Sequence, residues 1–149
     1  MSTSTSGPGE SVFFYGLFMD AGVLEGKGIR AVEPRVGRLE GYRLSIGARA
    51  TLVSAQGEAV YGVVMQVPAE EIERLYSESS VSAYRSEAIQ VTLSDGQRVE
   101  AVCYNLPPPV EPSEPNRAYA RELHDVAKRL GLPDEYLTRI AQAGEERGA

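Results

Sequence analysis

The sequence offers few side chains that could act as nucleophiles or metal ligands. Its 149 residues include one histidine, His124, and one cysteine, Cys103. A Ser-His-Asp or Cys-His arrangement would have to use His124, but its charged neighbours in a helical pattern are those of a solvated helix face. Cys103 lies in an alternating strand pattern and is expected to be a small buried hydrophobic residue. One Cys and one His cannot form a Cys/His zinc site or an internal disulfide.

Carboxylates, tyrosine hydroxyls and backbone amides remain as the groups that could do chemistry. The sequence has 21 Asp and Glu residues and 8 Tyr. An apolar run at 12–15 ends at Gly16, and a turn there could direct successive N–H groups into a cavity that holds an oxyanion or a carboxylate. The alternative is that Gly16 only ends a strand. The glycines between residues 22 and 28 match neither a GxGxxG pattern nor a P-loop, so a phosphate-binding loop is not indicated.

The composition argues against several function classes. Lys and Arg number 15 against 21 acidic residues, and the net charge of -6 opposes nucleic-acid binding. No apolar run approaches the roughly 20 residues of a membrane span, and the N-terminus lacks the features of a signal peptide. We therefore expect a soluble, cytoplasmic protein without a nucleic-acid or membrane partner. Its expected layout is a disordered leader at 1–11, one domain at 12–142 and a polar tail at 143–149.

The elements that would position the site are predicted to be strands first and helices last. Apolar or alternating runs predict strands at 12–15, 36–39, 42–46, 50–53, 59–67, 88–93 and 99–105. Turns are expected at Glu40–Gly41, at 56–58 and at 94–97, where Asp-Gly separates two alternating runs. A loop or one short helical turn is expected between residues 22 and 28.

Three amphipathic segments complete the prediction. Helices are expected at 68–76, at 119–130 and from Pro133 onward, with Gly131 at a C-terminal cap. The resulting fold class is α+β: a mixed, mainly antiparallel, barrel-like sheet with a short inserted helix and two C-terminal helices.

Four motifs occur in an order that resembles the γ-glutamylcyclotransferase-like family. VFFYGLFMD at 12–20 stands where that family has a strand and a Tyr-Gly-Ser/Thr loop. RATL at 49–52 and EAVYGVV at 58–64 resemble its Ala-Thr and Val-Trp/Tyr-Gly-Val-Val strands. LYSESSVSAY at 75–84 echoes its Leu-Asp-x-x-Glu-Gly segment, and GLPDEY at 131–136 resembles its helix junction. The match covers roughly residues 12–140 and implies the γ-glutamylcyclotransferase-like fold.

The resemblance implies an enzyme that cyclises a γ-glutamyl amine or peptide to 5-oxoproline and releases the amine. The nucleophile is the substrate's own α-amine, so no cofactor or metal is implied. One carboxylate must accept a proton and pass one to the leaving amine, and backbone N–H groups of the Tyr-Gly loop must hold substrate oxygens.

The resemblance also assigns residues to these roles. Ser79 stands at the family's catalytic Glu, and we expect the neighbouring Glu78 to serve as the base instead. Tyr76 stands where the family has Asp, and Leu17 where it has Ser or Thr, which removes a hydroxyl but leaves the backbone donors. The expected substrate-binding residues are those of the loop and three tyrosines: Tyr15, Gly16, Leu17, Phe18, Met19, Tyr84, Tyr104 and Tyr119. Each tyrosine could instead be half-buried core.

Two alternatives stay open. One is a relative without catalytic activity that binds a small molecule or peptide in the same pocket. The other is a different reaction in that pocket with Tyr84 or Glu87 taking part, although Glu87 is expected to face outward from an alternating strand. The expected partner is a small γ-glutamyl molecule. The sequence leaves the oligomeric state open, a dimer included.

Overall fold

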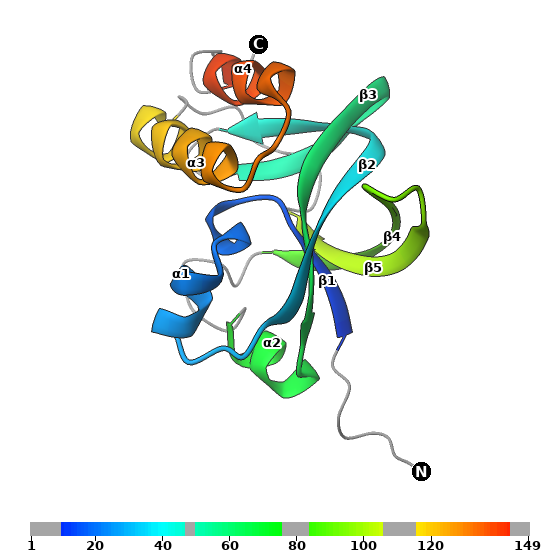
Figure 1. Cartoon of the computed structure of the whole chain (residues 1–149), viewed down its shortest axis with the longest axis vertical. Helices are drawn as coiled ribbons and strands as arrows, with labels where there is room; N and C mark the ends of the chain where they lie inside the picture. The colour runs from blue at the N-terminus through cyan, green and yellow to red at the C-terminus, as the bar shows by residue number, and fades with distance from the viewer. Residues whose placement is uncertain (1–9, 47–49, 76–83, 106–115, 144–149) are drawn as a thin grey trace.

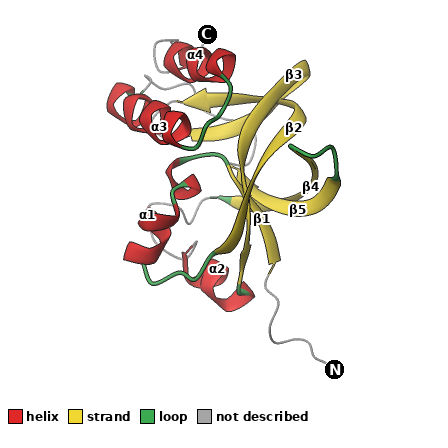
Figure 2. Cartoon of the chain, in the orientation of Figure 1, coloured by secondary structure: helices red, strands yellow, loops and turns green. Residues whose placement is uncertain are grey.

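The computed structural model describes residues 10–46, 50–75, 84–105 and 116–143, and the segments between and beyond them are not described. Strands and helices follow one another along the chain (Figures 1 and 2). In order they are β1 (Glu10–Phe14), η2 (Leu17–Met19), α1 (Ala21–Gly26), β2 (Val32–Ile46), β3 (Ala50–Val67), α2 (Ala69–Leu75), β4 (Arg85–Leu93), β5 (Arg98–Asn105), α3 (Arg117–Arg129) and α4 (Asp134–Ala143).

The strands form a closed barrel in the order β1-β3-β2-β4-β5. β1 pairs antiparallel with β3 and parallel with β5, where Val12 lies opposite Val102. The parallel pair closes the barrel and brings the carboxyl ends of β1 and β5 to the same end of it. Val12, Phe13 and Phe14 are all buried, because β1 is covered on both faces. The predicted fold class is confirmed.

The two longest strands correct the sequence prediction. Residues 36–39 and 42–46 are not a hairpin but parts of one strand, β2, which pairs along its length with β3. The register shifts between Glu40 and Tyr42, which pair with Ala59 and Ser54, so the extra residues of this irregularity lie in β3, opposite Gly41 with φ 89°. The expected turn at 56–58 is likewise absent, because residues 50–67 are one strand with Gly57 at φ 84°.

The helices lie in two pairs at one side of the barrel. Figure 1 shows α3 and α4 together in the upper part of the view, near the C-terminus, and α1 and α2 in the lower part. α3 buries an apolar stripe, packs against α4 and η2, and carries Asn116 as its N-cap. The three predicted helices are confirmed. Helix α1 overlaps the stretch at 22–28 where a loop or one short helical turn was expected, and η2 precedes it.

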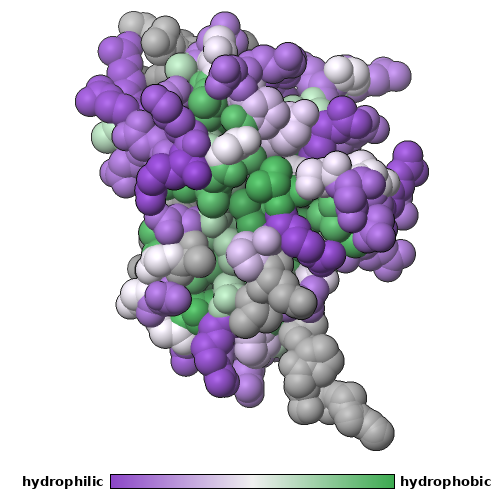
Figure 3. Space-filling model, viewed as in Figure 1, coloured by the Kyte–Doolittle hydropathy of each residue, from purple (hydrophilic) through white to green (hydrophobic). Residues whose placement is uncertain are grey.

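The surface between these pairs is partly apolar. Figure 3 shows hydrophobic residues across the middle of one face, with hydrophilic residues over the C-terminal helices. Within the described ranges, no helix has both the length and the apolar character needed to cross a membrane. β1 begins at Glu10, two residues before the predicted start of the domain.

Candidate functional site

The turn after β1 is the centre of the candidate site. Tyr15 is buried, and its hydroxyl donates a hydrogen bond of 2.6 Å to the backbone carbonyl of Tyr104 on β5. The N–H of Met19 donates to the carbonyl of Gly16 at 2.9 Å, which closes the turn into η2. Phe18 packs edge-on against Phe14, with ring centroids 6.1 Å apart. The turn is therefore fixed by contacts to both neighbouring strand ends.

Gly16 lies in close approach to another side chain and has no unusual dihedral angle. A Cβ atom at this position would lie 2.4 Å from the hydroxyl oxygen of Tyr119. Tyr119 lies in the first turn of α3, where its N–H donates to the side chain of Asn116 at 3.0 Å. The structure thus brings the Tyr119 hydroxyl against the backbone of the Tyr-Gly turn, and the substrate-binding roles of both residues stay predictions.

The other two predicted tyrosines lie differently. Tyr84 donates a hydrogen bond to the backbone carbonyl of Ala50 and so joins the start of β4 to the start of β3. Tyr104 contributes its carbonyl to the Tyr15 bond. Burial, and then the charges of Glu10 and Glu73, raise the pKa of its own hydroxyl. The Tyr104 hydroxyl is therefore neutral at physiological pH.

A polar cluster that the sequence analysis did not predict lies beside these residues. Tyr42 donates to Glu87 Oε2 at 2.9 Å, and Asn105 Nδ2 donates to Glu87 Oε1 at 2.7 Å. Glu87 is exposed, in the first part of β4, which precedes the buried Ile89 and Val91. The exposure agrees with the expectation that Glu87 faces outward, but its carboxylate is held by two side chains of the neighbouring strands.

The cluster affects two neighbouring ionisable groups. Burial, and then the hydrogen bond to Glu87 and its charge, raise the pKa of Tyr42 to about 12. Burial, with a smaller contribution from Glu87, raises the pKa of the Cys103 thiol to about 12. Cys103 is fully buried and un-ionised, which confirms the structural role expected for it.

The part of the chain that forms the barrel and the Tyr-Gly turn matches the model of a known protein family. The model of the gamma-glutamyl cyclotransferase, AIG2-like family matches residues 12–125. The chain belongs to this family. The resemblance predicted from the motifs is confirmed. A search of curated proteins gave no match.

Solved structures share the family fold at low sequence identity. A protein titled gamma-glutamyl cyclotransferase aligns with a TM-score of 0.75 and 21% identity, over 88% of this chain and 85% of its own. An uncharacterized human protein aligns with a TM-score of 0.74 and 22% identity, over 88% and 85%. A yeast gamma-glutamyl cyclotransferase specific to glutathione aligns with a TM-score of 0.65 and 15% identity, over 93% and 96%. These likenesses establish the fold.

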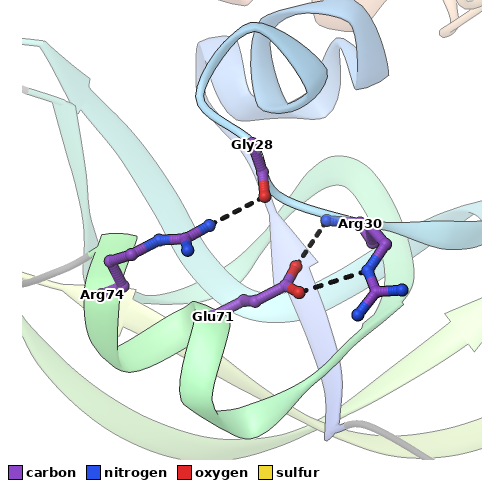
Figure 4. A network of polar contacts seen from close by, with 4 residues as sticks. All are labelled: Gly28, Arg30, Glu71 and Arg74. Atoms are coloured by element: carbon purple, nitrogen blue, oxygen red, sulfur yellow. Dashed lines mark hydrogen bonds and ion pairs between the residues drawn. The ribbon is translucent and has the colours of Figure 1, made fainter.

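Tyr76, Glu78 and Ser79 lie at 76–83, outside the described residues, so the role predicted for Glu78 stays a prediction. Helix α2, which leads into this segment, is held by a polar network (Figure 4). Glu71 accepts hydrogen bonds from the backbone N–H of Arg30 at 2.6 Å and from its Nε at 3.4 Å. Arg74 donates to the carbonyl of Gly28 at 2.8 Å. The network joins α2 to the chain after α1.

Glu71 is charged in this network. The backbone hydrogen bond from Arg30 is the largest cause that lowers its pKa, and the charges of Arg30 and Arg74 add to it. Both carboxylate oxygens face donors of Arg30, so Glu71 is engaged in fixing α2.

His124 lies on the outer part of α3, with its side chain about one third exposed and Nδ1 3.6 Å from Asp125. This position agrees with the expected solvated helix face. In the part of the chain that the structure describes, no three His, Cys, Asp or Glu residues are grouped closely enough to hold a metal ion.

Proposed function

We propose that the protein is a γ-glutamyl cyclotransferase that converts a γ-glutamyl amine to 5-oxoproline and the free amine. The α-amine nitrogen of the substrate attacks the γ-carbonyl carbon, a five-membered ring forms and the bond to the leaving nitrogen breaks. The α-nitrogen changes from an ammonium to the ring N–H and loses two protons, and the leaving amide nitrogen gains two and ends as an ammonium, so protons and charge balance. The reaction requires no oxidant, cofactor or metal.

The observation that supports this proposal is the Tyr15–Gly16 turn in a chain of this family. The turn is fixed by the Tyr15 hydrogen bond to Tyr104 and by Tyr119 against Gly16. Backbone N–H groups of such a turn are suited to stabilise the oxygen that gains charge as the γ-carbonyl is attacked. Holding the amine and the carbonyl of one substrate in attack geometry supplies much of the rate acceleration.

In this proposal Glu78 takes the proton from the α-ammonium and delivers one to the leaving amine. A positioned acid or base contributes typically 10²- to 10⁴-fold to the rate. Ser79 cannot exchange protons in this way near neutral pH, and Glu78 is its immediate neighbour in the sequence.

The test is release of 5-oxoproline from a panel of γ-glutamyl amines and peptides. We expect turnover of at least one member and a loss of roughly 100-fold or more in kcat for Glu78→Gln. Glu70→Gln, an exposed position in the first turn of α2, is the matched control and should retain activity. Full activity in Glu78→Gln would remove the role of Glu78. No 5-oxoproline from any member would contradict the proposed activity.

A second candidate function is binding without turnover, which the Ser79 substitution favours. Under this alternative a γ-glutamyl compound would raise Tm in a thermal-shift assay while no 5-oxoproline accumulates.

A further inference from the structure

The Tyr42, Glu87 and Asn105 cluster has the composition of a binding site for a cation. Glu87 on β4 and Asn105 on β5 are diagonal neighbours, since Arg85 pairs with Asn105 and Glu87 pairs with Cys103. Both Glu87 oxygens accept hydrogen bonds, one from Asn105 Nδ2 and one from Tyr42. These two donors hold the carboxylate in one orientation.

Asn105 carries an acceptor that lacks a partner. Its side chain is 6% exposed, and its Nδ2 group donates to Glu87 and to Cys103 Sγ at 3.3 Å. Its Oδ1 atom is buried and has no hydrogen-bond partner among the described residues. Leaving a buried acceptor unpaired is costly, so this oxygen marks a position suited to an N–H donor.

Glu87 has no ion-pair partner among the described residues. Its hydrogen-bond donors are neutral groups, a phenol and an amide, and no Lys or Arg of the described ranges forms an ion pair with it. A fixed anion beside an unpaired carbonyl oxygen matches the three N–H donors of a primary ammonium group.

The cluster adjoins the Tyr-Gly turn. The carbonyl that accepts the Tyr15 hydrogen bond belongs to the peptide bond between Tyr104 and Asn105. The backbone of Asn105 therefore touches the candidate site from one side, and its side chain touches Glu87 on the other.

We propose that Glu87 and Asn105 form a subsite for a primary ammonium group, which in the proposed reaction is the α-ammonium of the γ-glutamyl moiety. The identity of that group rests on the proposed function, whereas the subsite itself rests on the cluster. Glu87 would hold the nitrogen beside the turn that holds the carbonyl oxygen. It would thus act as a binding residue, and proton transfer would remain with Glu78.

The test compares two ligands that cannot be cleaved. One is a 2-amino-5-(alkylthio)pentanoate, in which CH₂–S replaces the γ-carbonyl and the amide nitrogen, and the other lacks the 2-amino group. Calorimetry on the full chain should show the amino compound binding about tenfold tighter, as expected for charge-assisted hydrogen bonds. Glu87→Gln should remove this preference, and Glu87→Asp, which keeps the charge, should retain part of it.

Glu100→Gln is the matched control, because Glu100 is exposed on β5 and alternates away from Ala101 and Cys103. It should keep the full preference. An unchanged preference in Glu87→Gln, or equal binding of both ligands to the wild-type protein, would overturn the subsite. Release of 5-oxoproline without any ammonium preference would retain the proposed function and reject the subsite. A Glu87-dependent preference without release of 5-oxoproline would retain the subsite and reject the proposed function.

Discussion

Two glutamates with the same number of hydrogen-bonded oxygens have opposite surroundings. Glu71 on α2 receives both donors from Arg30, and positive charge lies beside it. Glu87 on β4 receives its donors from neutral Tyr42 and Asn105. The charge of Glu71 is paired with Arg30, whereas Glu87 is exposed and has no ion-pair partner among the described residues.

This difference teaches how to separate a supporting carboxylate from a candidate binding carboxylate. Glu71 is among the most buried charged residues described, yet its contacts are satisfied and connect α2 to the segment after α1. Glu87 is more exposed but adjoins a buried oxygen without a partner. Burial alone would select Glu71, whereas the hydrogen-bond partners of each carboxylate oxygen distinguish the two residues.

The largest effect on stability is expected from a comparison of two glycines, Gly62 in the barrel and Gly16 at the candidate site. A Cβ at Gly62 would lie 2.3 Å from the backbone carbonyl of Phe14, and one at Gly16 would meet only the end of the Tyr119 side chain. Gly62→Ala should therefore destabilise by about 1–3 kcal/mol or more, because backbone cannot move cheaply. Gly16→Ala should cost less stability but displace Tyr119 and reduce turnover. Urea unfolding and 5-oxoproline release measure the two effects.

Adding Tyr119→Phe removes the oxygen that the new methyl group meets at Gly16, and it should recover the stability lost in Gly16→Ala. A Gly16→Ala protein as unstable as Gly62→Ala would contradict the expectation that Gly62 supports the barrel and that Gly16 mainly shapes the candidate site.

The next largest effect is the dependence of stability on pH, through Glu71. The pKa of Glu71 is lowered from its ordinary value of 4.5 in the folded protein, so its stabilising contribution is present above that value and is lost as the pH falls through the folded pKa. Glu71→Gln should lower Tm at pH 7 and flatten the loss of Tm on acidification. Glu87→Gln serves as the matched carboxylate variant and should change Tm less, because it breaks no ion pair among the described contacts. Equal Tm losses in the two variants would contradict the claim that Glu71 stabilises the fold more than Glu87 does.

The smallest effect is at Cys103. Because its pKa is raised to about 12, the folded protein should react slowly with a thiol reagent at pH 8, and unfolding in guanidinium should release one reactive thiol. The Glu87 charge raises this pKa, so Glu87→Gln should shift the pH dependence of alkylation slightly downward while Glu71→Gln leaves it unchanged. A fast native reaction would contradict the buried position of the thiol.

Much of the fold was predictable because its signals are local. The Asp-Gly turn between β4 and β5 and the apolar stripe of α3 lie within short windows of sequence. Gly41 and Gly57 were misread because a glycine at positive φ serves a bulge as well as a turn, and only the paired strand distinguishes them.

The candidate site was predictable in part. The Tyr15–Gly16 turn was indicated by motif, and its contact with Tyr119 depends on how α3 packs against η2. Glu87 was assigned to the outer face because a charged residue in an alternating strand usually faces solvent. Its hydrogen bond to Tyr42 joins strands far apart in sequence, so no local pattern contains it.

The most direct test of the central claim is where a substrate binds, measured by NMR titration of the Glu78→Gln protein with a γ-glutamyl amine, which has both the carbonyl oxygen and the α-ammonium group. The account predicts saturable shifts of the Gly16 backbone amide and the Asn105 side-chain amide. It also predicts no shift of the Arg30 amide, which donates to Glu71. Binding that leaves Gly16 and Asn105 unshifted, or that shifts Arg30 instead, would contradict it.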